Sequence, residues 1–185
     1  MTLKILGGEF KGRLLKAPKG LQTRPTMSIL RKAVFDILQF KIQDTLFLDL
    51  FSGSGAMGIE ALSRGARQAI FVDSHRNAID TLKENLALLK IEARASVIQS
   101  DVFKALQKLH EMNTLCDIIY ADPPYGNPRA YTELLQFLDT KPLIEPQGIL
   151  FLEGPMPPPP TLKHLSPLPS RKYGDSELYQ FIFLP

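Results

Sequence analysis

The chain has 185 residues, of which 44% are hydrophobic and 22% charged, with a net charge of +3 and one cysteine. These values are ordinary for a globular protein, and the length suits one well-buried domain with a small appendage. The single cysteine excludes an internal disulfide, and no apolar run approaches the roughly 20 residues of a membrane span.

The first residues lack the apolar core of a signal peptide, so we expect a cytoplasmic protein. The three histidines, at 75, 110 and 164, offer no ligand spacing, and we predict no metal. Cys116 stands at the head of a predicted core strand, which favours a buried and inert thiol.

The first 43 residues carry most of the positive charge. They hold nine Lys or Arg against two acidic residues, a net +7, so the remainder carries −4. A basic segment on an acidic body suits a polyanionic partner, because each neutralised phosphate releases condensed counterions. A solvated surface without a partner explains the charge alone equally well.

The same segment predicts a hairpin of two short strands within residues 3–10 and 11–18. A helix is predicted over residues 24–40, where apolar residues recur at helical spacing and Thr26 can cap the first turn. We therefore divide the chain into a basic appendage, residues 1–43, and a larger domain, residues 44–185.

From residue 46 onward, short apolar strands alternate with helical stretches. Such alternation predicts a doubly wound α/β fold with a mostly parallel sheet covered on both faces. A fifth strand at 148–154 and a hairpin within 168–185 complete seven strands with an antiparallel edge. We read the proline run at 155–160 as a stiff connector rather than a polyproline ligand. The expected strands are 46–51, 68–73, 95–100 and 116–122, and the expected helices are near 56–65, 75–90, 102–112 and 130–140.

The stretch FLDLFSGSGAMGIEAL, residues 47–62, gives the strongest chemical signal. A strand ends near Asp49, a loop follows through Gly53 and Gly55, and a helix opens. Glycines let the backbone turn tightly and approach a ligand without a Cβ in the way. About 20 residues after Gly53, the next strand ends in Asp73, well placed to bind ribose hydroxyls. The pattern predicts a nucleotide-like cofactor and fits a nicotinamide dinucleotide as well as S-adenosylmethionine.

The third strand closes with Asp101 and Val102, which could bind an adenine amino group and pack on its ring. Helix capping by Asp101 is an equally weighted alternative. A dehydrogenase would need a proton donor near the nicotinamide, and no His or Lys stands at the matching place. This favours S-adenosylmethionine.

The fourth strand ends in an acid, two prolines and an aromatic ring, residues 122–125, at the sheet edge where ligands of open α/β folds bind. Asp122 and the carbonyl of Pro123 can each accept a hydrogen bond from an exocyclic amine, which aligns its lone pair for attack on a methyl group. Pro123 and Pro124 keep both acceptors still. Tyr125 offers a face on which a flipped base can stack. A plain turn, with Asp122 as a cap and Tyr125 merely packing, is the structural alternative.

These motifs resemble the class I S-adenosylmethionine-dependent amino methyltransferases. The leading residues, including Arg13 and the R-P-T segment at 24–26, are similar more narrowly to bacterial 16S ribosomal RNA guanine-N2 methyltransferases of the RsmD type. The closing RKYGDSELYQF is similar to the last strands of that family. The resemblance implies a Rossmann-like fold and methylation of one guanine, number 966, in an assembled or assembling 30S particle. We separately expect a monomer.

The resemblance also implies residue roles. It places catalysis at Asp122, Pro123 and Tyr125, with Pro124 in the same motif, and sets Arg24 and Thr26 near the active site. Lys11 and Arg13 would meet RNA. The implied cofactor contacts are Asp49, Phe51, Gly53, Gly55, Asp73 and Asp101. Val102, which could pack on the adenine ring, is a further candidate.

Three other functions stay open from the residues alone. An amino methyltransferase could act on another target, such as adenine N6 in DNA or RNA, or a protein. A nicotinamide-dependent oxidoreductase would use the glycine loop differently. An RNA-binding module with a vestigial pocket would keep the basic segment and lose the chemistry, although the acceptors at Asp122 argue against this.

Overall fold

The structure is a computed structural model that describes residues 3–17, 25–124, 128–141, 143–154, 161–174 and 176–185. Of residues 25–27 and 128 it describes the backbone only. Within the described residues, no helix is long and apolar enough to cross a membrane. The predicted roles of Arg24 and Tyr125, and of the proline run at 155–160, lie outside the described residues.

Seven strands form the central sheet, in the order β5-β4-β3-β6-β7-β9-β8. The first five to appear in the chain run parallel, and β9 joins β7 antiparallel with β8 at the edge. This confirms the predicted doubly wound fold with an antiparallel edge. The strands are β3 (Leu46–Leu50), β4 (Gln68–Asp73), β5 (Ala95–Gln99), β6 (Cys116–Ala121), β7 (Ile144–Glu153), β8 (Leu165–Tyr173) and β9 (Ser176–Phe183).

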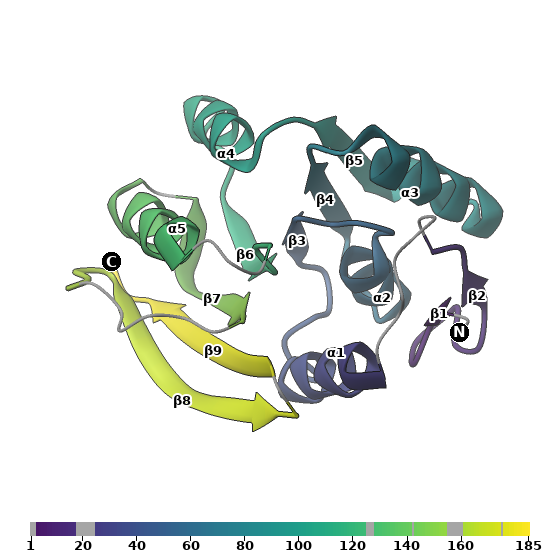
Figure 1. Cartoon of the computed structure of the whole chain (residues 1–185), viewed down its shortest axis with the longest axis horizontal. Helices are drawn as coiled ribbons and strands as arrows, with labels where there is room; N and C mark the ends of the chain where they lie inside the picture. The colour runs from purple at the N-terminus through teal and green to yellow at the C-terminus, as the bar shows by residue number, and fades with distance from the viewer. Residues whose placement is uncertain (1–2, 18–24, 125–127, 142, 155–160, 175) are drawn as a thin grey trace.

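Helices cover both faces of this sheet (Figure 1). On one face α1 (Pro25–Ile37), α2 (Ala56–Ser63) and α3 (Arg76–Leu89) bury one hydrophobic cluster. On the other, α4 (Val102–Glu111) and α5 (Pro128–Thr140) bury a second. Successive strand residues alternate between these clusters, as in Phe47 and Leu48 of β3. Because both faces are buried, the strands are apolar almost throughout.

The leading hairpin is shorter than its sequence suggests. Only β1 (Leu3–Lys4) and β2 (Leu14–Leu15) pair, antiparallel. Beyond this ladder, Ile5 N–H still donates to the Arg13 carbonyl, and the tip of the hairpin is bonded to the end of α2, where Glu9 N–H donates to the Ser63 carbonyl over 2.7 Å. Gly8 has φ of +75°, and a Cβ there would lie 1.7 Å from that carbonyl oxygen. The contact therefore requires glycine.

Hairpin residues Leu3, Ile5 and Leu15 are buried in the same cluster as α1, α2 and α3. The hairpin thus packs on the side of the main sheet, beside α2 (Figure 1). The division at residue 43 stays a prediction about folding units.

Several element ends differ from the expectations; β8, for example, begins at Leu165 rather than at residue 168. Helix α1 begins at Pro25, so Thr26 lies inside its first turn and the prediction that it caps the helix is wrong. Proline at the first helical position needs no N–H, which makes it a favourable start. The helix ends at Ile37 rather than residue 40. Strand β7 begins at Ile144 rather than 148, and its register against β6 shifts between Cys116 and Ile118.

Candidate active site

A tight loop joins β3 to α2 at the carboxyl edge of the sheet. Phe51, Gly53 and Gly55 have φ of 62°, 54° and 80°, all in the left-handed region. Gly55 precedes the helix, and its N–H donates to the Ser52 carbonyl over 2.7 Å. The sequence prediction of a glycine turn between strand and helix is confirmed.

Two buried carboxylates hold this loop in place. Asp49 of β3 is 1% exposed and accepts the Gly58 N–H over 2.9 Å. Asp73, at the end of β4, accepts the Gly53 N–H and the His75 N–H, each over 2.8 Å. Burial raises the pKa of Asp49 well above its usual range, with smaller contributions from Asp122 and Asp73. Five of the seven predicted cofactor residues, Asp49, Phe51, Gly53, Gly55 and Asp73, therefore form or contact one loop.

The loop leaves polar groups and space for a ligand. A Cβ built on Gly53 would meet no atom within 4 Å, so this side of the loop is open among the described residues. The buried Ser52 Oγ has no hydrogen-bond partner there. A buried hydroxyl without a partner costs free energy that a bound polar ligand would recover. The site fits a nucleotide-like group that follows the backbone at Gly53.

Asp101 caps α4. Its Oδ1 accepts from Phe103 N–H over 3.1 Å and Lys104 N–H over 3.2 Å. This confirms the capping alternative, while contact with an adenine stays a prediction. Val102, the first residue of α4, is buried and packs in the second cluster.

Asp122 follows β6 at the same edge as the glycine loop. Parallel pairing of β3 with β6 sets Asp49 opposite Tyr120, and alternation places Asp122 on the same face as both. Asp122 is partly exposed, whereas Pro123 is buried and Pro124 is exposed. Burial first, and then the charge of Glu153, raise the Asp122 pKa from 3.8 to about 8. This carboxyl therefore lies at the sheet's edge and not in the apolar core.

Tyr131 of α5 supports the second predicted acceptor. Its hydroxyl donates to the Pro123 carbonyl over 3.4 Å, a long contact. A carbonyl oxygen has two lone pairs, so one remains for an incoming amine. Asp122 and the Pro123 carbonyl are thus neighbours in the chain, and the Tyr131 hydroxyl contacts the carbonyl.

Sequence reasoning missed a second acid next to Asp122. Glu153 ends β7, the strand paired with β6, and is 6% exposed. Its carboxylate accepts hydrogen bonds from the hydroxyls of Tyr120 and Ser176. Burial raises its pKa, an effect that these two hydrogen bonds oppose. An acid at the end of a predicted strand next to residue 122 was the available signal.

Two further buried side chains bind the basic hairpin to neighbouring segments, Asn85 to the glycine loop and Glu60 to α2. Asn85 of α3 accepts from Lys16 N–H over 2.8 Å and donates to the carbonyls of Lys16 and Ser54, each over 3.0 Å. Glu60 of α2, which is fully buried, accepts from Leu6 N–H over 2.8 Å. No sequence pattern marked either residue.

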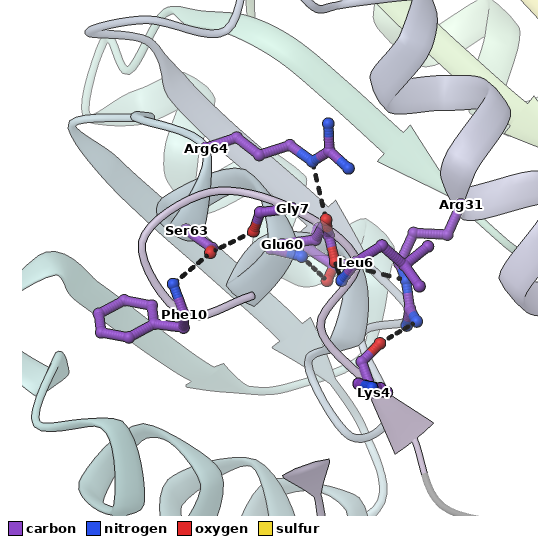
Figure 2. A network of polar contacts seen from close by, with 10 residues as sticks. Lys4, Leu6, Gly7, Phe10, Arg31, Glu60, Ser63 and Arg64 are labelled. Carbon is purple, nitrogen blue, oxygen red and sulfur yellow. Dashed lines mark hydrogen bonds and ion pairs between the residues drawn. The ribbon is translucent and has the colours of Figure 1, made fainter. Parts of the chain in front are cut away.

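Glu60 also forms ion pairs with two arginines, as Figure 2 shows. Arg64 Nε donates to Glu60 Oε1 over 2.7 Å, and Arg31 Nε lies 3.7 Å from Oε2. Arg31 reaches on to the hairpin, where its Nη2 donates to the Lys4 carbonyl over 2.7 Å. Helices α1 and α2 are therefore joined to the hairpin through one carboxylate.

The predicted RNA-contacting side chains of the hairpin point outward. Lys11 and Arg13 are exposed, and Arg13 Nη2 makes one bond, to the Leu88 carbonyl, over 3.3 Å. The side chain of Thr26 lies outside the described residues. Exposed cations of this kind can contact phosphates, and the RNA contacts of Lys11 and Arg13 stay a prediction.

Comparisons with known proteins agree with this geometry. Residues 3–182 match the family described as Conserved hypothetical protein 95. Ribosomal RNA small subunit methyltransferase D of Escherichia coli (strain K12) is 33% identical over 152 residues, which are 82% of this chain and 74% of that protein. YlbH of Bacillus subtilis (strain 168) is 37% identical over 151 residues, 82% of each chain. The solved structure of yhhF from Escherichia coli superposes with a TM-score of 0.84 at 26% identity, covering 100% of this chain and 99% of that one.

Proposed function

The chain belongs to the family described as Conserved hypothetical protein 95, and from this premise we propose that it methylates the exocyclic N2 of a guanine in 16S ribosomal RNA. Its relative named small subunit methyltransferase D supports the reaction and the class of RNA. The observation that carries the chemistry is the position of Asp122, at the same sheet edge as the glycine loop and on the same face as Asp49.

S-adenosylmethionine is the proposed methyl donor, and its sulfonium supplies an activated methyl group when bound. Asp73 would bind the ribose hydroxyls with the oxygen lone pairs that its two backbone bonds leave free. Gly53 and Gly55 would let the backbone pass close to the ligand, with Phe51 and Asp49 at the start of the loop. Asp101 and Val102 would border the adenine. The open space at Gly53 and the unpaired Ser52 hydroxyl support this placement.

Asp122 and the Pro123 carbonyl are the proposed acceptors for the amine. An exocyclic amine is a poor nucleophile because its lone pair is delocalised into the ring. Two fixed acceptors hold both N–H groups, so the lone pair is set in one direction, and such alignment is a large source of rate. The buried Pro123 and exposed Pro124 restrict the backbone at both acceptors. Tyr125 would stack on the flipped base.

The RNA would lie across the basic hairpin. Lys11 and Arg13 would contact phosphates, with Arg24 and Thr26 nearer the target base. Glu60 bonds the hairpin to α2, and Asn85 bonds it to the glycine loop. These bonds support a fixed distance between the proposed RNA contacts and the methyl donor. We further propose a 30S particle or its precursor as the substrate, guanine 966 as the target, and a cytoplasmic enzyme that works as a monomer.

The test is methyl transfer from labelled S-adenosylmethionine to 30S particles, naked 16S RNA, duplex DNA and protein, followed by mapping of the modified nucleotide. Asp122→Ala should lower transfer to RNA by about 100-fold or more while S-adenosylmethionine affinity stays within about tenfold. The control, Asp80→Asn, changes an exposed acid on α3. Transfer by Asp122→Ala at the parent rate would contradict the role of Asp122, and label found only in DNA adenine would contradict the substrate.

A further inference from the structure

We propose that Asp122 and Glu153 act as one proton-storing pair: the pair holds a proton in the free enzyme, releases it when the cationic methyl donor binds, and takes up the proton that the amine loses on methylation. The inference deepens the proposed function and rests on it. In this scheme Asp122 contacts the amine and Glu153 is a positioning residue that acts through Asp122.

The geometry of the pair comes from neighbouring parallel strands. Ala121 of β6 is opposite Leu152 of β7, so Asp122 and Glu153 each follow one residue later on adjacent strand ends. Residues at matching register positions share a face of the sheet. The two carboxyl groups therefore project from the same edge and the same face, where like charges oppose each other's ionisation.

Within the described part of the chain, hydroxyl groups and no cation contact the Glu153 carboxylate. Tyr120 and Ser176 donate to it, and none of the ion pairs among the described residues includes Glu153 or Asp122. A buried acid without a cation favours its neutral form, and two such acids side by side share a proton more readily than both ionise. The Asp122 pKa of about 8, raised by burial and by Glu153, agrees with this.

The titratable groups around the pair are mainly acids. Asp49 and Tyr120 face it from the sheet, and the Tyr120 pKa is raised by burial, Glu153, Asp122 and Asp49. Arg31 of α1 interacts with Tyr120, yet its guanidinium is bound to the Lys4 carbonyl and lies against Glu60. From α5, the Tyr131 hydroxyl adjoins the backbone at residue 154, where a Cβ would lie 2.1 Å from it.

A cationic ligand would change the charge balance of this cluster. A positive charge near the loop favours the ionised pair, so a proton leaves as the ligand binds. Asp122 then presents a carboxylate to the amine. On methylation the N–C bond forms, the S–C electron pair stays on sulfur, and one N–H proton passes to Asp122 Oδ. The enzyme returns to its protonated state with the neutral thioether product, so charge and protons balance over one turnover.

The cycle predicts a difference between two ligands of nearly the same shape. S-adenosylmethionine carries the sulfonium charge and S-adenosylhomocysteine does not. Titration calorimetry at pH 7 in buffers of different ionisation enthalpy counts the protons released. We expect about 0.5 to 1 proton for S-adenosylmethionine and less than about 0.2 for S-adenosylhomocysteine. Equal release with both ligands in the unaltered protein would overturn the inference, and this comparison needs no variant.

Variants then assign the proton to the pair. Glu153→Gln keeps a hydrogen-bonding side chain and removes the charge, so Asp122 ionises more easily and release at pH 7 should fall by about half or more. Asp122→Asn should remove most of the release. Glu133→Gln, an exposed change on α5, is the matched control and should match the parent. The amino group of the ligand titrates alike in every case, so differences between variants report the protein.

The outcomes separate the two proposals. If S-adenosylmethionine binds and the released proton is the same in the parent and in Glu153→Gln, the pair is refuted while the proposed function stands. If S-adenosylmethionine does not bind at all, the proposed function fails and the inference fails with it. A merely structural role for Glu153 would change the unfolding midpoint and leave the proton count per ligand bound unchanged.

Discussion

The Asp122 carboxyl should lower the stability of the folded protein near neutral pH. Its pKa rises from 3.8 to about 8 on folding, because of burial and the charge of Glu153. Between these two values the folded state binds more protons than the unfolded state, so the free energy of unfolding falls as pH rises. This loss of unfolding free energy is absent below about pH 4 and complete above about pH 8.

The magnitude follows from the proton affinities. A tenfold change in affinity is worth about 1.4 kcal/mol, so the full shift corresponds to about 6 kcal/mol. Part of the carboxyl reaches solvent, and Glu153 shares the proton, so we expect about 2 to 3 kcal/mol to appear in unfolding experiments. Asp122→Asn keeps the shape and removes the ionisation.

The assay is urea unfolding of the parent and of Asp122→Asn at pH 5 and pH 8.5. The variant should gain about 2 to 3 kcal/mol relative to the parent between the two values. The exposed Asp80→Asn should show a change under about 0.5 kcal/mol. If the unfolding free energies of the two proteins differ by the same amount at both pH values, the pKa of Asp122 is not raised by folding, and Asp122 and Glu153 do not share a proton.

The remaining predictions concern the ties between hairpin and loop and the single thiol. Asn85→Ala leaves backbone groups of Lys16 and Ser54 without partners, so unfolding free energy should fall by about 3 kcal/mol and S-adenosylmethionine should bind more weakly. Asn77→Ala, exposed on the same helix, should do neither. Gly8→Ala meets the Ser63 carbonyl and a φ of +75°, so a loss of more than about 2 kcal/mol is expected; an unchanged urea midpoint would contradict the docking of the hairpin. Cys116 is buried, which raises its pKa to about 12, so a thiol reagent at pH 8 should label it only after unfolding; rapid labelling of the native protein would contradict this.

Local sequence rules predicted most of the elements because each rule depends on near neighbours in the chain. Apolar runs between glycines and polar turns specify buried strands, and 3.6-residue periodicity specifies the helices that cover them. The glycine loop was predictable for the same reason, since a positive φ at Gly53 is a local demand. Element ends were less predictable, as at Thr26, because a proline start satisfies the helix as well as a cap does.

In the candidate site, too, local sequence patterns predicted some residues and missed those with partners far away in the chain. Residues 49, 53, 55, 73 and 122 were recognisable because they lie at or just after the ends of strands, and carboxyl ends of parallel strands meet at one edge. For Asp101 the sequence left capping and adenine binding equal; the hydrogen bonds to Phe103 and Lys104 show the cap, and contact with an adenine stays a prediction. Glu60 and Asn85 carried no pattern, because their partners are hairpin backbone groups far away in the chain.

By itself the sequence determined a doubly wound sheet, a glycine loop with an acid on each side, and an acceptor motif after the fourth strand. Only the tertiary structure decided that Glu153 lies next to Asp122 on the neighbouring strand, that Tyr120 donates a hydrogen bond to Glu153, and that the hairpin is bonded to α2. The reason is physical: periodicity and turn chemistry act over a few residues, whereas proton sharing depends on strand register and burial, which exist only after distant segments have packed together.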